Sequence, residues 1–174
     1  VIDAGSGIGR EVCRVLAREG ANVVAADQNI TTAQETVAFL EVSCIFFLQV
    51  PNILHINVED RNSVEAVFKD VVKQFSKPPT IIVNSAGIVR KIFLMKLDDS
   101  NFDDVINVNL KGTFLVTQIA VKMLIEGNAT TNSSIINISS IAASGRYVGH
   151  STYSASKAGV IAMIKSASLE FGQY

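Results

Sequence analysis

Gly5-Ser6-Gly7-Ile8-Gly9-Arg10 is the stretch that decides the fold, because it follows a short apolar run, 1–3, and opens a helical pattern. Glycines let the backbone turn tightly and approach a pyrophosphate closely. The free N–H groups at the start of the helix then face the anion. A glycine cluster taken alone is also typical of a plain strand–helix turn, so the interpretation as a dinucleotide site depends on residues elsewhere.

Short β-branched runs alternate with longer helical patterns along the rest of the chain. The predicted strands are 1–3, 22–26, 54–58, 80–84 and 134–139. The predicted helices are 8–19, 31–40, 60–75, 99–126 and 151–172. This alternation is typical of a parallel sheet with helices on both faces, and ligands of such sheets bind at the carboxyl ends of the strands.

The fold class follows from that alternation. We expect an α/β fold of the Rossmann type, a doubly wound parallel sheet in three α/β/α layers that stops after the helix carrying Tyr153 and Lys157. No linker divides the sequence, so residues 1–174 are interpreted as a single NAD(P)-binding domain, incomplete at both ends.

The composition narrows the classes of function. The 174 residues are 48% hydrophobic, which predicts one sizeable core, and a net charge of -1 without a basic run argues against a nucleic-acid partner. The most apolar run, 42–50, is too short to span a bilayer and Pro51 ends it, so no membrane span is expected. Cys13 and Cys44 give neither zinc spacing nor a disulfide framework, and no metal is expected.

Asp27 supports the dinucleotide interpretation. It ends the second predicted strand, where a carboxylate accepts both hydroxyls of an adenosine ribose. Its charge would repel a 2′-phosphate, and Ser6 offers no positive charge to compensate. Both positions favour NAD over NADP, although a strand-end carboxylate can also be merely solvated.

Tyr153 and Lys157 lie four residues apart in the last predicted helix, on one face and about one turn from each other. Ser140 precedes them, just past a strand end. A phenol is a weak base at neutral pH, but a nearby ammonium favours its ionised form. Tyr153 would exchange a proton with the substrate oxygen as hydride moves, while Ser140 holds that oxygen and Lys157 holds ribose hydroxyls. A surface Tyr–Lys pair is the ordinary alternative.

In this order, these residues resemble the short-chain dehydrogenase/reductase family over the whole chain. Asn84-Ser85-Ala86-Gly87 resembles the strand end that backs the cofactor in that family. The resemblance implies that Asn84, Ala86 and Gly87 contact the cofactor. It implies the same for Gly5, Ser6, Gly7, Ile8, Gly9, Asp27, Gln28, Asn57, Val58, Tyr153 and Lys157.

Val108-Asn109-Leu110 matches the position of the family's fourth catalytic residue. The resemblance implies that Asn109 sits at a bend in the helix 99–126. Its backbone carbonyl would then hold a water that links Lys157 to solvent. The catalytic set implied by the resemblance is therefore Asn109, Ser140, Tyr153 and Lys157, with Ser140 also contacting the substrate.

Three further stretches, 111–118, 134–141 and 153–161, are more specific. They resemble family members that act on 3-oxoacyl thioesters in mitochondria and bacteria, and that oxidise steroid 17-beta-alcohols. The resemblance implies an NAD-dependent oxidoreductase of 3-oxoacyl or 3-hydroxyacyl thioesters or of a steroid 17-beta-alcohol. It also implies a mitochondrial matrix location, with the cytoplasm as the alternative, and a homo- or hetero-tetramer formed through the helices 99–126 and 151–172.

The sequence departs from the family pattern in several places. Ile2 and Asp3 stand where the family has Thr and Gly, and the side chain and charge of Asp3 are expected to disturb a pyrophosphate. Asn57 stands where the family usually has Asp. The connector 41–53 matches no family pattern and is interpreted as an insertion or a gene-model error. Because the family continues past the position of Tyr174 with further strands, we expect an exposed apolar sheet edge and an exposed face on the last helix.

Two classes of function stay open. The intact Ser140, Tyr153 and Lys157 favour an enzyme. Asp3 and the missing C-terminal strands favour a non-catalytic nucleotide-binding or assembly subunit of a reductase complex, or an inactive fragment. Fold alone cannot choose between these classes.

Overall fold

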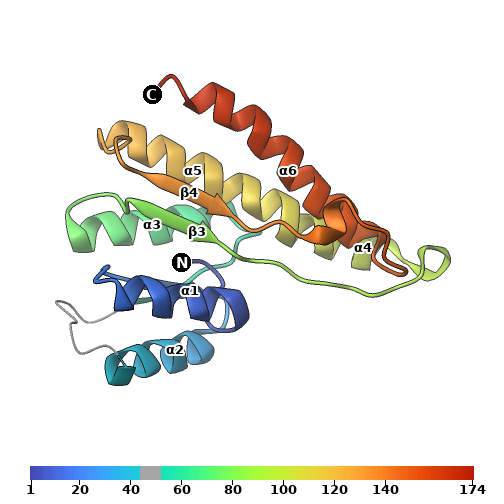
Figure 1. The fold of residues 1–174 in the computed structure, drawn as a ribbon, viewed down its shortest axis with the longest axis horizontal. Coiled ribbons are helices and arrows are strands. Elements are labelled where there is room, and N and C mark those ends of the chain that lie inside the picture. Colours follow the sequence, from blue (N-terminus) through green and yellow to red (C-terminus); the bar gives the residue numbers. More distant parts are fainter. Residues whose placement is uncertain (44–51) are drawn as a thin grey trace.

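The computed structural model describes residues 1–43 and 52–174 (Figure 1). Its α-helices are α1 (Gly7–Arg18), α2 (Ile30–Ser43), α3 (Arg61–Phe75), α4 (Asp99–Ile106), α5 (Thr113–Glu126) and α6 (Ser151–Phe171). Its strands are β1 (Val24–Asp27), β2 (Asn52–His55), β3 (Ile81–Asn84) and β4 (Ser134–Asn137). The interpretation of the connector 41–53 as an insertion or a gene-model error falls largely outside the described residues.

The N-terminal residues form the middle of the sheet. Ile2 makes parallel bridges to Ala26 on one side and to Asn84 on the other. β1 pairs in parallel with β2, and β3 with β4. The strand order is therefore β2, β1, N-terminal strand, β3, β4, and the direction of winding reverses at the N-terminal strand. A crevice at the carboxyl end of this central strand is where such folds bind ligands.

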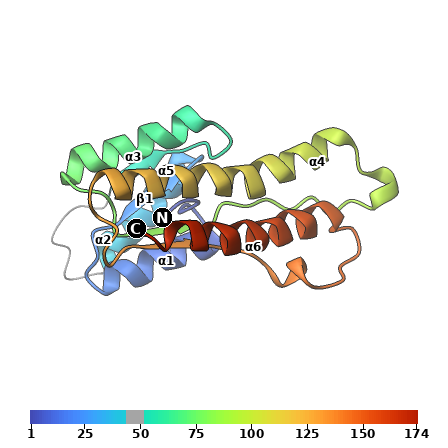
Figure 2. The same ribbon diagram turned by 90° about the horizontal axis from the view of Figure 1, so that it is seen from above.

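Each face of the sheet has its own core. On one face, Cys13 of α1 and Leu40 of α2 belong to a cluster that includes Ala25. On the other face, Phe68 of α3 and Val116 of α5 belong to a cluster that includes Ala26. The neighbouring residues Ala25 and Ala26 point to opposite faces, as successive side chains of a strand do. Figures 1 and 2 show α1 and α2 on one side of the sheet and α3 and α5 on the other, with α6 beside α5. The predicted three-layer α/β/α fold is confirmed.

The helix predicted at 99–126 is divided in the structure. α4 ends at Ile106, a π-helical segment, η2, covers Asn107–Gly112, and α5 then begins at Thr113. A π segment inserts an extra residue into a helix and is frequent at functional sites. Residues Asp99–Glu126 are long and apolar enough to cross a membrane by length and composition, and 56% of their most apolar 18-residue window is buried inside the fold.

The second strand differs from its prediction. It was expected at 54–58, whereas β2 covers Asn52–His55. Its partner β1 ends at Asp27, which pairs with His55, so the chain leaves the sheet soon after this pair. The apolar residues Ile56 and Val58 are nevertheless buried, because they join the core under α3 and α5.

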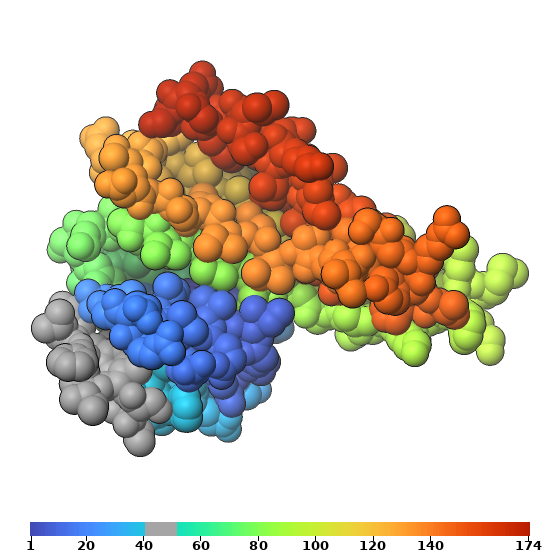
Figure 3. All heavy atoms as spheres, in the orientation of Figure 1, coloured from blue at the N-terminus to red at the C-terminus, as the bar shows by residue number. Residues whose placement is uncertain are grey.

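The loops after β3 and β4 leave the body of the molecule together. Figure 3 shows them projecting with α4 beyond the packed layers. The Ile92 N–H donates to the Gly149 carbonyl at 3.0 Å and joins the two loops. They carry the short 3-10 helices η1 (Leu94–Lys96) and η3 (Ile141–Ala143), neither of which was predicted.

The edge strand β4 and the outer face of α6 carry exposed apolar side chains. Ile136 of β4 is 46% exposed, and Leu169 of α6 is 83% exposed. In the described chain β4 pairs only with β3. The expected exposed sheet edge and exposed helix face are therefore confirmed.

Candidate functional site

The glycine turn presents an open helix start. Ser6 occupies the N-cap position of α1 with an extended backbone, and its side chain makes no capping hydrogen bond. Ser6, Gly7 and Ile8 are exposed, and no acidic residue lies in the first turn. The N–H groups of this turn therefore remain available to an anion, as a pyrophosphate site requires.

Gly5 and Gly9 are needed for close packing around this turn. A methyl group on Gly9 would overlap the Asp3 carbonyl oxygen, and one on Gly5 would overlap the Thr32 side chain. Gly7 has a φ of +48°, in the left-handed region that favours glycine. Together these glycines let α1 start directly above the central strand.

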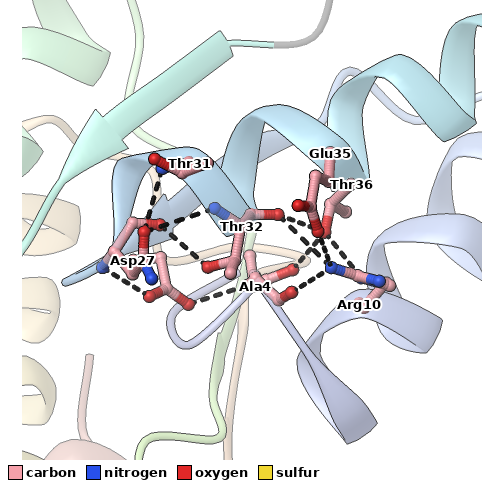
Figure 4. Close-up of polar contacts among 9 residues, drawn as sticks. Ala4, Arg10, Asp27, Thr31, Thr32, Glu35 and Thr36 are labelled. Carbon is pink, nitrogen blue, oxygen red and sulfur yellow. Dashed lines mark hydrogen bonds and ion pairs between the residues drawn. The ribbon is translucent and has the colours of Figure 1, made fainter.

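Asp27 lies at the end of β1 and is 7% exposed. Its Oδ2 accepts the Gly5 N–H at 2.7 Å, and its Oδ1 accepts the Asn29 N–H at 2.8 Å. Figure 4 shows the carboxylate between the glycine turn and the start of α2. A carboxylate has about four acceptor positions, so the two oxygens of Asp27 can each accept one more hydrogen bond, as a ribose diol requires.

Arg10 stabilises the glycine turn, a role that the sequence analysis did not predict. Its guanidinium donates to the Gly5 carbonyl and to Thr36 Oγ1, the latter at 3.0 Å, and pairs with Glu35 at 3.2 Å (Figure 4). These contacts tie the glycine turn to α2. They also commit the one cation of the glycine motif to partners on α2, so Arg10 supplies little positive charge to an anion at the helix start.

The remaining expected residues of the adenosine side lie beside β1 and β2. Gln28 is exposed directly after Asp27. Asn57 is half-buried, and its side-chain oxygen accepts the Glu59 N–H at 3.0 Å. Val58 is buried against Gly112, where a methyl group would approach its side chain within 2.8 Å.

The strand end at Asn84 to Gly87 lies on the other side of the central strand. Asn84 is 2% exposed, and its Nδ2 donates to Asn137 at 3.4 Å. Ser85 donates through its hydroxyl to the Ile2 carbonyl at 3.0 Å. Ala86 is half-buried, and Gly87 faces α6. A methyl carbon on Gly87 would lie 3.2 Å from Lys157 Nζ, so the glycine leaves room for the ammonium.

Asn109 fastens the loop after β3 to the helices. Its side chain accepts the Ile88 N–H at 2.8 Å, and donates to the Ile88 carbonyl at 3.0 Å and to Ser156 Oγ at 3.1 Å. Ser156 in turn donates to the Tyr153 carbonyl at 2.7 Å. The expected bend at Asn109 coincides with η2, and its backbone carbonyl accepts the Thr113 hydroxyl at 2.7 Å.

Ser156 was not predicted as a site residue. It is fully buried on α6 between the two residues that were, Tyr153 and Lys157. No sequence signal distinguishes it from other serines on a helix, because its partner Asn109 is 47 residues away. Its hydroxyl links the π segment to the helix that carries the reactive pair.

Lys157 lies inside the crevice and is 3% exposed. Its Nζ donates to the Ile138 carbonyl at 2.9 Å and lies 5.9 Å from the centre of the Tyr153 ring. Burial lowers the pKa of the Lys157 ammonium, and the charge of Asp3 opposes this shift. The predicted Tyr–Lys pair is therefore brought together beside the strand ends.

Ser140 caps the short helix η3, which packs against α6. Its Oγ accepts the Ala142 N–H at 3.1 Å, which leaves its hydroxyl proton to donate. The half-buried Tyr153 meets the His150 ring edge-on, at 6.2 Å between ring centres, and His150 meets Tyr147 at 6.0 Å. The neighbouring serine Ser139 donates to the Lys157 carbonyl at 2.9 Å and anchors β4 to α6.

Asp3 occupies the end of the central strand, at the centre of this constellation. Its φ is +64°, and its half-buried carboxyl has a pKa raised to about 6. Burial is the largest cause, the charge of Asp27 adds to it, and the charge of Lys157 opposes it. The site therefore holds two carboxyl groups and one ammonium around the place where a dinucleotide would lie.

The residues present fit a nicotinamide dinucleotide in most respects. The uncapped start of α1 suits the pyrophosphate, and Asp27 has acceptor positions for a ribose diol. The ammonium of Lys157 donates one N–H to the Ile138 carbonyl and has further donors for the second ribose. Asp3 is the residue that does not fit, because its charge would face the anion. Among residues 1–43 and 52–174, no cluster of His, Cys, Asp and Glu could hold a metal ion.

A wide surface groove lies away from the strand ends. A groove of about 790 Å³ runs between α3 and α5, with Phe68 and Met123 among its lining residues. None of the predicted site residues lines it. The functional assignment therefore rests on the strand-end geometry and not on the size of a cavity.

Comparison with known proteins gives a consistent result. A family model described as short chain dehydrogenase matches residues 1–174. A (3R)-3-hydroxyacyl-CoA dehydrogenase of Homo sapiens is 41% identical, over all of this chain and 67% of that protein. The 3-oxoacyl-[acyl-carrier-protein] reductase FabG of Thermotoga maritima is 37% identical, over 95% of this chain and 64% of that protein. The chain thus spans about two thirds of the length of these relatives.

Solved structures agree with the sequence relatives. A sorbitol-6-phosphate 2-dehydrogenase from Erwinia amylovora superimposes with a TM-score of 0.90 at 26% identity. The match covers 99% of this chain and 66% of the dehydrogenase chain. A short chain dehydrogenase from Mycobacterium smegmatis has a TM-score of 0.88 at 26% identity, and covers 99% of this chain and 71% of that one.

Proposed function

The chain belongs to the short-chain dehydrogenase family, and from this premise we propose that it is an oxidoreductase of 3-oxoacyl and 3-hydroxyacyl thioesters that uses a nicotinamide dinucleotide. The observation that carries the proposal is the position of Tyr153 and the buried Lys157 beside Gly87 and Asn109, at the carboxyl ends of the strands. Two relatives support acyl thioesters as the substrate class. One is named as a (3R)-3-hydroxyacyl-CoA dehydrogenase and the other as a 3-oxoacyl-[acyl-carrier-protein] reductase.

The chemistry divides between the bound cofactor and the side chains. A nicotinamide supplies or accepts the hydride when it is bound. In the reductive direction the Tyr153 hydroxyl donates its proton to the carbonyl oxygen of the substrate and becomes a phenolate. In the oxidative direction the phenolate takes the proton of the substrate hydroxyl and becomes a phenol again. Lys157 Nζ lies 5.9 Å from the Tyr153 ring centre, which places a positive charge beside the phenol.

Ser140 and Asn109 position the reaction. The free hydroxyl proton of Ser140 is available to the substrate oxygen, which it would hold near Tyr153. Asn109 fixes both the loop after β3 and, through Ser156, the turn of α6 that carries Tyr153. Ser140 would therefore position the substrate oxygen, and Asn109 positions the turn of α6 that carries the phenol.

The projecting loops supply apolar surface for an acyl group. Large apolar side chains on these loops are exposed on the side of the molecule that holds η1 and η3. They are Phe93, Leu94, Met95, Ile141 and Val148. An acyl chain bound there would bury apolar surface against the protein. Burial of apolar surface away from water stabilises binding by roughly 25 cal/mol per Å².

Asp27 supports NAD as the preferred cofactor. The carboxylate is positioned to accept ribose hydroxyls, and its charge disfavours a 2′-phosphate. Arg10 is the nearby cation that could have offset this repulsion of a 2′-phosphate, but it is engaged with Glu35 and Thr36. We therefore propose NAD over NADP. From the family resemblance alone, we propose the mitochondrial matrix as the location, with the cytoplasm as the alternative.

Helices 99–126 and 151–172 are proposed to form the contacts of a homo- or hetero-tetramer. A groove of about 430 Å³ between α5 and α6 is lined by apolar side chains that include Phe114, Met163 and Ile164. Phe114 is 40% exposed. Light scattering on the purified protein tests this proposal: a tetramer mass supports it, and a monomer mass at micromolar concentration contradicts it.

The test of the function has two stages. Quenching or enhancement of NADH fluorescence first measures cofactor binding, with NADPH as the comparison. Oxidation of NADH in the presence of an acetoacetyl thioester then measures turnover, with estradiol and NAD as the steroid comparison. Binding with thioester turnover supports the proposal.

The same test addresses the competing class. Binding of NADH without turnover of either substrate would favour a non-catalytic nucleotide-binding or assembly subunit, for which the charge of Asp3 is the supporting observation. Failure to bind either nicotinamide dinucleotide would contradict both.

A further inference from the structure

Asp3 stands where the sheet changes its direction of winding. The residues on both sides of it are hydrogen-bonded into the sheet: the Ile2 N–H donates to the Val83 carbonyl at 2.9 Å, and the Ala4 N–H donates to the Ala26 carbonyl at 3.2 Å. Above it, Gly9 of α1 packs directly on the Asp3 carbonyl. The position of Asp3 is therefore fixed by the sheet and the first turn of α1.

The backbone of Asp3 is held in a conformation that suits glycine. Its φ of +64° is in the left-handed region, where aspartate and asparagine occur more often than other side chains. Among residues 1–43 and 52–174, Ser76, Asn128 and Asn132 also have a positive φ; Ser76 follows the end of α3, and the two asparagines lie between α5 and β4. Strain of this kind persists only where the surroundings determine the conformation.

The charged groups around Asp3 come from three elements. Asp27 faces it from the end of β1, and Lys157 faces it from α6. Arg10 of α1 is engaged with Glu35 and with the Gly5 carbonyl. Ser85, after β3, is neutral and donates its hydroxyl proton to the Ile2 carbonyl. An ionised Asp3 therefore leaves the crevice with two carboxylates and one ammonium.

We infer that Asp3 makes cofactor binding depend on protonation, so that the dinucleotide enters the crevice with uptake of a proton by the Asp3 carboxylate. This inference rests on the proposed function, because it concerns the same cofactor. A pyrophosphate at the start of α1 would meet an ionised Asp3 across the first turn, and the repulsion between the two anions is relieved when the carboxyl group is protonated.

The direction and size of the effect follow from linkage. Burial and Asp27 raise the pKa of Asp3 to about 6, so the group changes charge within an accessible pH range. If only the protonated form admits the dinucleotide, affinity weakens by up to about tenfold for each pH unit above that value. Below that value, affinity becomes independent of the protonation of Asp3.

Two substitutions separate the charge of Asp3 from its backbone conformation. Asp3→Asn removes the charge, keeps the size, and tolerates a left-handed φ. Asp3→Gly removes both the charge and the strain. Asp70→Asn is the matched control, because Asp70 is an exposed carboxylate on α3 away from the strand ends.

The experiment is calorimetric titration of NAD into the purified protein and the three variants between pH 5.5 and 8, roughly the range that spans the Asp3 transition. Titrations in two buffers with different heats of ionisation give the number of protons taken up. We expect the affinity of the unmodified protein and of Asp70→Asn to fall toward high pH with proton uptake. We expect Asp3→Asn and Asp3→Gly to bind at pH 8 at least about tenfold more tightly, without uptake.

The outcomes distinguish this inference from the proposed function. Equal affinities of the unmodified protein and Asp3→Asn at every pH would overturn the inference and leave the function intact. Tight binding by Asp3→Gly alone would assign the defect to backbone strain and overturn the protonation account. If no variant binds NAD or NADP at any pH, the proposed function fails and the inference fails with it.

Discussion

The catalytic side and the nucleotide side of the crevice are built differently. On the catalytic side, the side chains of Asn109 and Ser156 form a continuous hydrogen-bonded chain from the loop after β3 to Tyr153. On the nucleotide side, the turn is closely packed by Gly5 and Gly9, yet Asp3 adds a carboxyl group in a left-handed backbone conformation. The comparison teaches that two properties of this chain are separate. The residues that position Tyr153 for proton transfer are in place, whereas the charge of Asp3 disfavours the anionic cofactor.

The largest effect is expected at the phenol. Tyr153→Phe removes the group that exchanges a proton with the substrate, and general acid–base catalysis contributes typically about 10²- to 10⁴-fold to a rate. We expect thioester turnover to fall by that amount with NADH affinity nearly unchanged. Steady-state kinetics measure the loss. Tyr174→Phe, at an exposed tyrosine, is the control and should keep full turnover.

The catalytic side should also be sensitive in stability. Asn109→Ala leaves the Ile88 N–H and the Ile88 carbonyl without their side-chain partner, and removes the donor to Ser156 Oγ. Each buried unsatisfied group costs about 1–3 kcal/mol, so we expect a loss of about 2–4 kcal/mol in the free energy of unfolding, measured by urea denaturation. Asn107→Ala, in the same π segment, is the comparison. A similar loss in both variants would contradict the special role of Asn109.

The nucleotide side is expected to respond in affinity and selectivity. Asp27→Ser shortens the side chain and removes the charge that would accept the ribose diol. Hydrogen bonds to charged groups contribute about 1.5–3 kcal/mol, so NAD affinity should fall about 10- to 100-fold. NADP should lose less, because the repulsion of its 2′-phosphate disappears. If the ratio of NAD to NADP affinity stays constant, Asp27 does not select the cofactor.

The smallest effect concerns the stability of the cofactor-free protein. Because the pKa of Asp3 is raised to about 6 in the folded state, its ionisation disfavours the fold. Protonated Asp3 therefore contributes to the free energy of unfolding. This contribution is fully present below the unfolded-state pKa of about 3.9 and is lost as pH rises through about 6. The unfolding temperature of Asp3→Asn should not decline in this way as pH rises. Parallel pH profiles for Asp3→Asn and the unmodified protein would show that ionisation of Asp3 does not destabilise the fold.

The architecture could be predicted because it depends on local patterns. Alternating β-branched runs and helical periodicities place the strands and helices, and Gly5 to Gly9 mark the turn at the centre of the sheet. The division of 99–126 at Asn107–Gly112 could not be predicted, because a π segment depends on contacts such as that of Asn109 with Ile88. The end of β2 depends on where its partner β1 stops.

The site was predicted as a set of residues and not as a network. Tyr153 and Lys157 share a helix, so their spacing alone indicates that they face the same side. Ser156 and the guanidinium contacts of Arg10 were missed, because their partners are distant in sequence. The disturbance expected at Asp3 was visible as a departure from a motif, but its electrostatic coupling to Lys157 required the fold.

The central claim is that hydride passes between a nicotinamide and an acyl thioester beside Tyr153. The most direct measurement incubates the protein with an acetoacetyl thioester and NADH that carries deuterium at the transferable position, followed by mass spectrometry of the product. The account predicts a 3-hydroxyacyl thioester with deuterium on the carbon that bears the hydroxyl, and about 10²- to 10⁴-fold slower formation of it with Tyr153→Phe. A product without deuterium, or no product while NADH is bound, would contradict it.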